Sequence, residues 1–122
     1  MKVFELTTDE QRKVLRLFFR GIVRGSDLIP DFAKYEQLVM AMGPGFIVVT
    51  DLADLERMEL DCVPHVTRLM DRFVAGGVNK VVRVIPDPDK DIGFNLLSMT
   101  HYRGRIPVVT YRTREEAEAA LT

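Results

Sequence analysis

The chain has 122 residues, of which 47% are hydrophobic and 29% charged, and its formal net charge at pH 7 is −1. This composition is typical of one globular domain and excludes a disordered or fibrous protein, so we expect a single domain over residues 1–122. A nearly balanced charge gives no general attraction to nucleic acid or to an anionic membrane. The apolar runs are far shorter than the roughly 20 residues of a membrane-spanning helix, so we expect no membrane span.

The N-terminal segment predicts a β-hairpin. Residues 2–8 (KVFELTT) are rich in β-branched and aromatic side chains, which favours a strand. Residues 14–20 then alternate, which is the pattern of a half-buried strand. One face of this strand carries Leu15, Leu17 and Phe19, and the other carries Arg16, Phe18 and Arg20. The second strand could extend to about Val23.

A helix is predicted next, from about residue 26 to residue 42. Ser26 or Asp27 could cap its start, and Pro30 suits a first helical turn. Apolar side chains recur at helical spacing until glycines at 43 and 45 end the pattern.

Two further units of strand and helix follow. Residues 46–51 (FIVVTD) are apolar on both faces, which is typical of a central parallel strand covered by helices. A helix is predicted to begin at Asp61, which would act as its N-cap, and to end at Gly76. Residues 80–85 (KVVRVI) predict another buried strand.

The C-terminal third predicts a loop, a weak helix, a strand and a last helix. The weak helix covers residues 92–102, and the strand covers residues 106–111. Thr113 and Glu116 have the spacing of a capping box at the start of the last helix. The element order therefore predicts an α/β fold: a mixed, roughly five-stranded sheet with an N-terminal hairpin and about four helices.

This order and the segment FIVVTDLADLERMELDC resemble the STAS domain family of anti-sigma-factor antagonists, and most closely its small SpoIIAA-like members with a STAS/SEC14-type fold. In that family a central strand ends in Asp-Leu, and an Asp-Ser or Asp-Thr pair starts the next helix. Asp51–Leu52 and Asp61–Cys62 occupy those places here. The C-terminal VVTYRTREEAEAAL is similar to the family's last strand and terminal helix.

One departure from the family concerns its phosphate switch. The resemblance implies that the residue after the second Asp is a Ser or Thr phosphorylated by a partner kinase, whereas this chain has Cys62. A thiol cannot be that acceptor, so we expect the switch to be absent or altered. The family's other trait, a surface around this helix start that docks a partner or small ligand, remains the expectation.

The same region contains the candidate site residues Asp51, Asp54, Asp61, Cys62 and His65. A thiol at a helix N-terminus is either a reactive thiolate or a small buried hydrophobe. Cys62 and His65 could share a helix face, and with Asp51 they form our enzyme alternative. We expect no catalytic function, because the sequence marks neither an oriented histidine nor an oxyanion site.

A second candidate cluster precedes the last strand and contains His101, Arg103 and Arg105. Arginines there could bind a phosphate or carboxylate, or the segment could be a solvated connector. Asp87, Asp89 and Asp91 are spaced like the first ligands of a calcium-binding EF-hand loop. The sixth position of such a loop would be Ile92 instead of Gly, and the twelfth would be Ser98 instead of Glu, so we expect no calcium site there. A single cysteine excludes a multi-cysteine zinc site, so we expect no metal and no cofactor.

The function that we expect is a non-enzymatic regulatory or scaffold module that docks a protein partner. The alternative is a SEC14-like domain that binds a small apolar or anionic ligand. We expect a bacterial, cytoplasmic protein, since one free cysteine fits a reducing compartment. A homodimer is also expected, because Phe18 between Arg16 and Arg20 resembles an interface anchor and the sheet has two edges.

Overall fold

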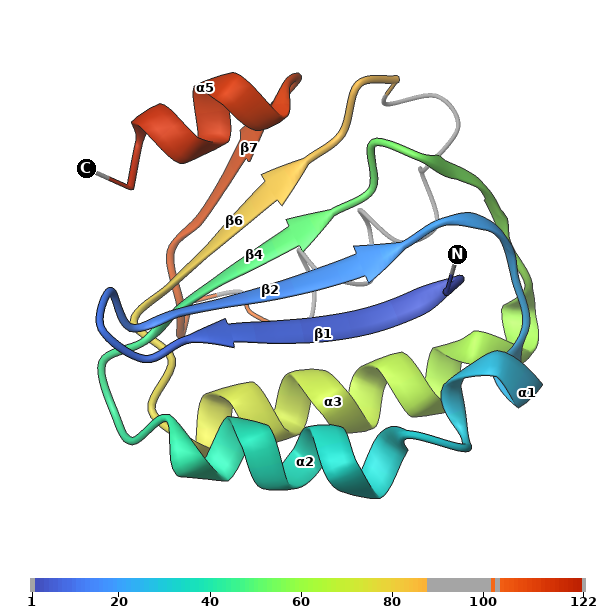
Figure 1. Ribbon diagram of the computed structural model, residues 1–122, viewed down its shortest axis with the longest axis horizontal. Coiled ribbons are helices and arrows are strands. Elements are labelled where there is room, and N and C mark those ends of the chain that lie inside the picture. The colour runs from blue at the N-terminus through green and yellow to red at the C-terminus, as the bar shows by residue number, and fades with distance from the viewer. Residues whose placement is uncertain (1, 88–101, 103, 122) are drawn as a thin grey trace.

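The computed structural model describes residues 2–87, 102 and 104–121. Its main element is a five-stranded sheet with the strand order β1-β2-β4-β6-β7 (Figure 1). The antiparallel hairpin consists of β1 (Phe4–Asp9) and β2 (Val14–Phe19). The sheet then continues in parallel through β4 (Ile47–Asp51), β6 (Lys80–Val84) and β7 (Val108–Tyr111). The predicted mixed α/β sheet with an N-terminal hairpin is therefore confirmed.

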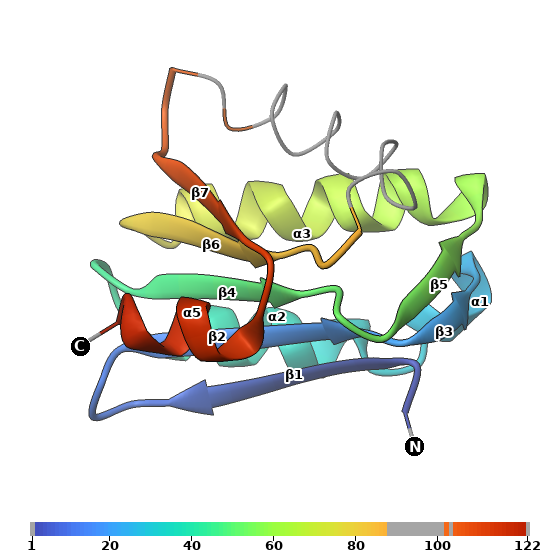
Figure 2. The ribbon, with the colours of Figure 1, turned by 90° about the horizontal axis from the view of Figure 1, so that it is seen from above.

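Helices lie on both faces of this sheet. Two long helices, α2 (Phe32–Ala41) and α3 (Val63–Ala75), cover one face, which we call the two-helix face. The C-terminal helix α5 (Arg114–Ala119) lies on the opposite face, which we call the α5 face (Figure 2). This arrangement buries the parallel strands β4 and β6 on both faces, as is usual for the inner strands of a parallel sheet.

The alternation in β2 assigns its side chains to the two faces as predicted. Leu15, Leu17 and Phe19 are at most 3% exposed and belong to the core of the two-helix face. Arg16 and Phe18 point to the other face and remain partly exposed. A smaller apolar cluster on that face contains Val14, Val49, Val82, Val84 and Ala117.

A second, two-stranded sheet was not predicted. It pairs β3 (Gly21–Val23) with β5 (Leu55–Met58) in parallel. The possible extension of the second strand to Val23 is therefore wrong, because the chain leaves the main sheet at Arg20. Gly21 has a φ of 64°, which is readily accessible to glycine, and this conformation turns the chain into β3.

The predicted helix over residues 26–42 is two helices. A single turn, α1 (Gly25–Leu28), ends before Pro30, and α2 begins afterwards at Phe32. The N-cap of α1 is Arg24, so the predicted caps are also wrong. Asp27 instead accepts a hydrogen bond from the Arg24 N–H. Pro30 breaks the pattern because it has no N–H with which to continue the helical hydrogen bonds.

Near the C-terminus the predicted strand is shorter and the predicted cap is confirmed. The strand begins at Val108 rather than Ile106. The Thr113 side chain accepts a hydrogen bond from the Glu116 N–H at the start of α5. The predicted weak helix over residues 92–102 lies, apart from Tyr102, outside the described residues. Among the described helices, not one has the length and apolar character needed to cross a bilayer.

Candidate functional site

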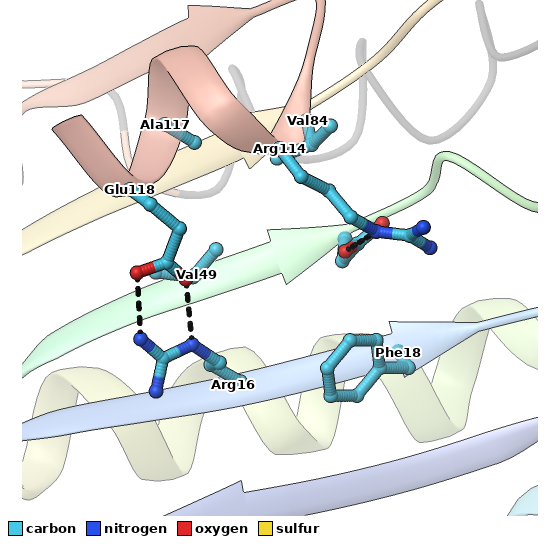
Figure 3. A pocket seen from close by; sticks show the side chains of 8 residues that line it. Arg16, Phe18, Val49, Val84, Arg114, Ala117 and Glu118 are labelled. Carbon is cyan, nitrogen blue, oxygen red and sulfur yellow. Dashed lines mark hydrogen bonds and ion pairs between the residues drawn. The ribbon is translucent and has the colours of Figure 1, made fainter. Parts of the chain in front are cut away.

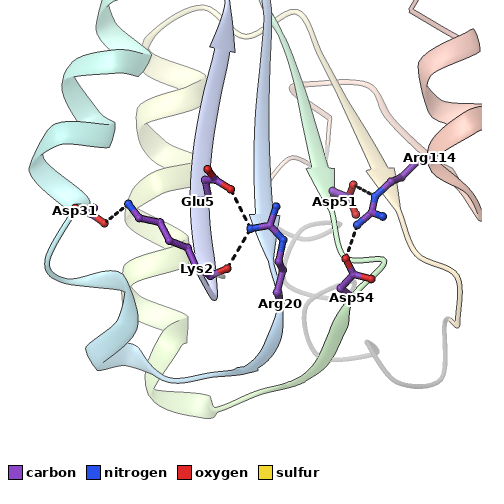
Figure 4. A network of polar contacts seen from close by, with 7 residues as sticks. All are labelled: Lys2, Glu5, Arg20, Asp31, Asp51, Asp54 and Arg114. Atoms are coloured by element: carbon purple, nitrogen blue, oxygen red, sulfur yellow. Dashed lines mark hydrogen bonds and ion pairs between the residues drawn. The ribbon is translucent and has the colours of Figure 1, made fainter.

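Two of the candidate carboxylates meet at the carboxyl end of the central strand β4. The Arg114 Nε donates to Asp51 Oδ2 at 2.6 Å, and its NH2 group donates to Asp54 Oδ2 at 2.7 Å (Figure 4). Asp51 is only 5% exposed and also accepts a hydrogen bond from the Ala53 N–H. Both carboxylates, Asp51 first, raise the pKa of the Arg114 guanidinium. This arrangement attaches α5 to the end of β4.

Sequence reasoning missed Arg114. Its position contained a usable signal, because Arg114 is the first residue of α5 and a cation is unfavourable at a helix N-terminus. An arginine there indicates a nearby carboxylate that compensates it. The sequence alone could not identify that carboxylate, since Asp51 lies 63 residues earlier in the chain.

A groove lies beside α5 on the α5 face (Figure 3). Its volume is about 280 Å³. The sheet contributes Arg16, Phe18, Val49, Asp51 and Val84 to its lining, and α5 contributes Arg114, Ala117 and Glu118.

Arg16 and Glu118 form the second attachment of α5 to the sheet. The Arg16 Nε and NH2 groups donate to the two oxygens of Glu118, each at 2.9 Å (Figure 3). Arg16 lowers the pKa of the Glu118 carboxyl through these hydrogen bonds. The groove is therefore bordered by arginine–carboxylate pairs, one set from Arg16 and one from Arg114.

Asp61 does not cap the following helix, so this prediction is wrong. It lies in a short 3-10 helix, η1 (Leu60–Cys62), and α3 has Cys62 at its N-cap position without a side-chain cap bond. The Asp61 Oδ1 instead accepts a hydrogen bond from the Gly25 N–H at 2.9 Å. The Asp61 carboxylate therefore connects η1 to α1 and does not cap the N-terminus of α3.

Cys62 is buried. Its exposed fraction is 0%, and its thiol donates to the Val23 carbonyl at 3.4 Å. Burial raises the pKa of the Cys62 thiol to about 11. A thiol with this pKa is protonated at neutral pH and is a poor nucleophile. Cys62 therefore fits the interpretation as a small buried hydrophobe.

The remaining predicted site residues do not join Asp51. The His65 ring packs beside Phe32, with ring centroids 6.4 Å apart, while the Cys62 thiol is directed at Val23. Arg105 borders a separate, shallow hollow with Gly104, Ile106 and Pro107. His101 and Arg103 lie outside the described residues. Within the described ranges, no group of three or more His, Cys, Asp or Glu could hold a metal ion.

Exposed apolar side chains are found around the start of α3. Leu60 is 86% exposed, and Val63 is 42% exposed. Ile29, which follows α1, is 59% exposed, and α1 is bonded to η1 through Gly25 and Asp61. We call these three residues the α3-start patch. The three residues belong to or follow elements that contact one another, since α1 contacts both η1 and α3. Exposed apolar side chains on such neighbouring elements mark a candidate interaction surface.

Comparison with protein-family models and with curated protein sequences found no match. Comparison with solved structures found the anti-sigma factor antagonist SpoIIAA in its unphosphorylated form, with a TM-score of 0.61 and 18% identity over 97% of this chain and 96% of that one. A candidate anti-sigma factor antagonist from Thermotoga maritima matches with a TM-score of 0.52 and 16% identity, over 97% and 93% of the two chains. These likenesses extend over nearly the whole of each chain, and this chain has a STAS/SpoIIAA-like fold.

Proposed function

We propose that the protein is a non-enzymatic regulatory or scaffold module that docks a protein partner through the α3-start patch. The observation that carries this proposal is the exposure of Leu60 and Val63 where η1 leads into α3. The likeness of the fold to SpoIIAA and to a candidate anti-sigma factor antagonist supports a regulatory role. The proposed setting is a reducing cytoplasm, which fits one free thiol.

The proposed module works without the phosphate switch of the antagonists. Cys62 has no hydroxyl, and its side chain is buried against Val23. Incubation with ATP and cell lysate, followed by mapping of the peptide from residue 54 to residue 68, tests this point. Thr67 is the one hydroxyl in that peptide, so stoichiometric phosphate on Thr67 would contradict it.

The docking proposal is tested with a charge placed in the patch. Leu60→Glu should abolish capture of the partner from lysate, because an unpaired carboxylate would be buried in the interface. Met40→Glu is a matched control, since Met40 on α2 is 72% exposed and lies outside the patch. Equal capture by the two variants would refute the patch as the docking surface.

Self-association is part of the same proposal, because the partner could be a second copy. Phe18 is not a free anchor: the Arg20 guanidinium lies over its ring, 4.5 Å from the centroid. Light scattering across a concentration series tests the dimer. A mass of one chain up to about 100 μM would exclude an interface of roughly micromolar affinity.

A second candidate function, the binding of a small ligand, is favoured by the groove beside α5. The groove has apolar side chains on its floor and hydrogen-bonding groups at its borders, as ligand sites commonly do. Partner docking remains the first proposal, because Ile29, Leu60 and Val63 are exposed in the α3-start patch, whereas the apolar side chains of the groove are at most partly exposed.

A further inference from the structure

The groove on the α5 face has the dimensions of a site for a small ligand. Its volume of about 280 Å³ is close to the lower end of the range of about 300–1,000 Å³ for ligand pockets. Phe18, Val49, Val84 and Ala117 give it an apolar lining. An aromatic ring among aliphatic side chains favours a flat apolar molecule, which can contact the part of the Phe18 ring that the Arg20 guanidinium does not cover and remove the lining from water.

The charged groups at the groove are already paired with one another. Both lining arginines are engaged, Arg16 with Glu118 (Figure 3) and Arg114 with Asp51 (Figure 4). An anionic ligand would have to replace one of these carboxylates, and a cationic ligand would have to replace an arginine. Because neither exchange adds a hydrogen bond overall, the groove fits a neutral molecule better than a charged one.

The two walls of the groove come from different parts of the fold. The sheet supplies Phe18 and Val49, whereas α5 supplies Ala117 and its two charged neighbours in the lining. A molecule in the groove would therefore contact α5 and the sheet at the same time. Binding to this arrangement alone stabilises it against any state in which α5 has separated from the sheet.

We propose that this groove is a binding site for a small, neutral, planar apolar molecule, and that the bound molecule holds α5 on the sheet. This proposal rests on the second candidate function, the binding of a small ligand, and specifies the binding site and the chemical class of the ligand. It also decides between the apolar and anionic ligands that the sequence left open, in favour of the apolar ligand.

The experiment is a titration of the isotope-labelled full chain with indole, followed by amide chemical shifts. We expect saturable shifts at the residues around the groove, including Phe18, Val49 and Ala117. Indole-3-acetate, which has a similar ring and a negative charge, should bind more weakly. Amide hydrogen exchange across α5 should slow when indole is bound, because the bound state keeps α5 docked.

A pair of variants tests the place of binding. Phe18→Ala should weaken indole binding by about two- to tenfold, the usual worth of one aromatic contact. Met40→Ala removes an exposed apolar side chain of α2 that does not line the groove, so it should leave the affinity unchanged. Unchanged shifts in the two-helix core would show that Phe18→Ala preserves the fold.

Several outcomes would overturn the proposal. These are no saturation up to about 10 mM indole, equal or tighter binding of indole-3-acetate, and shifts that saturate elsewhere in the chain. The last result would leave small-ligand binding standing but remove the groove as its site. Groove shifts that depend on protein concentration without indole would identify a second copy as the occupant. Partner capture by the Leu60→Glu variant is measured in a separate experiment, so failure of the docking proposal can be distinguished from failure of the ligand proposal.

Discussion

The two faces of the sheet are stabilised by different physics. On the two-helix face, α2 and α3 bury a continuous apolar core that includes Phe19, Phe46 and Phe73. On the α5 face, one helix of six residues buries the single side chain of Ala117. Ala117 packs in a small apolar cluster with Val49 and Val84, and arginine–carboxylate pairs add to the attachment of the helix.

The two kinds of interaction differ in how much they stabilise the fold and in how strongly they respond to solution conditions. Apolar burial contributes about 25 cal/mol per Å², and because it involves no charges it is not screened by salt and does not titrate with pH. Pairs between partly exposed charges contribute about 0–1 kcal/mol each and weaken with salt. The two-helix face should therefore set the global stability of the domain, and α5 should be able to separate at a lower free-energy cost.

The largest expected effect lies in the core of the two-helix face. Phe73 on α3 is 1% exposed and contacts Phe46 edge to face, with centroids 6.5 Å apart. Phe73→Ala should lower the free energy of unfolding by about 3–5 kcal/mol, because it removes transfer energy and leaves a cavity. Urea denaturation measures this loss. A cost below that of Arg114→Ala would reverse the ranking of the two faces.

The junction between α1 and η1 should show the next largest effect. A Cβ at Gly25 would lie 2.8 Å from the Asp61 carbonyl oxygen, which is backbone and cannot rotate away. Gly25→Ala should therefore cost about 1–3 kcal/mol. The neighbouring change Ser26→Ala, at an exposed position, is its control. Equal midpoints of chemical denaturation for the two variants would show that the backbone at the junction of α1 and η1 shifts to accept the Cβ at no measurable cost.

Arg114→Ala tests the attachment of α5 at the end of β4. The change leaves the nearly buried Asp51 carboxylate without its guanidinium partner. We expect a loss of about 1–3 kcal/mol, the usual cost of unsatisfying a buried acceptor, and faster amide exchange across α5. Arg112→Ala removes an exposed arginine just before the same helix and is the matched control. Identical exchange in both variants would mean that Arg114 does not hold α5.

The elements that sequence reasoning placed correctly depend on local pattern. Alternation in β2 placed Leu15 and Phe19 in the core, and the spacing of Thr113 and Glu116 located the start of α5. Period and capping are set by residues a few positions apart, so one sequence is enough to see them.

The features that sequence reasoning missed depend on contacts between distant segments. β5 has the sequence LERM, in which apolar and polar residues do not alternate, and it pairs with the distant strand β3. Asp61 has the chemistry of a helix cap, but the Gly25 N–H, 36 residues away, takes its carboxylate. The pairing of Arg114 with Asp51 and Asp54 required the fold itself.

The smallest expected effect is the pH dependence of the Arg16–Glu118 pair. Arg16 holds the pKa of the Glu118 carboxyl below its ordinary value of 4.5. A lowered folded-state pKa stabilises the fold above the unfolded pKa, and this contribution disappears as pH falls through the folded pKa. Glu118→Gln should therefore be less stable than the wild type at pH 7, by less than about 1 kcal/mol for a pair this exposed.

The difference between the Glu118→Gln variant and the wild type should shrink below pH 4.5, where the wild-type carboxylate takes up its proton. Glu115→Gln is the control, because Glu115 is an exposed glutamate of the same helix that does not line the groove with Arg16. Denaturation midpoints at pH 3, 5 and 7 measure both variants. A difference for Glu118→Gln that stays constant over this range would show that the ion pair does not hold α5, and the contrast between the two faces would then rest on Arg114 alone.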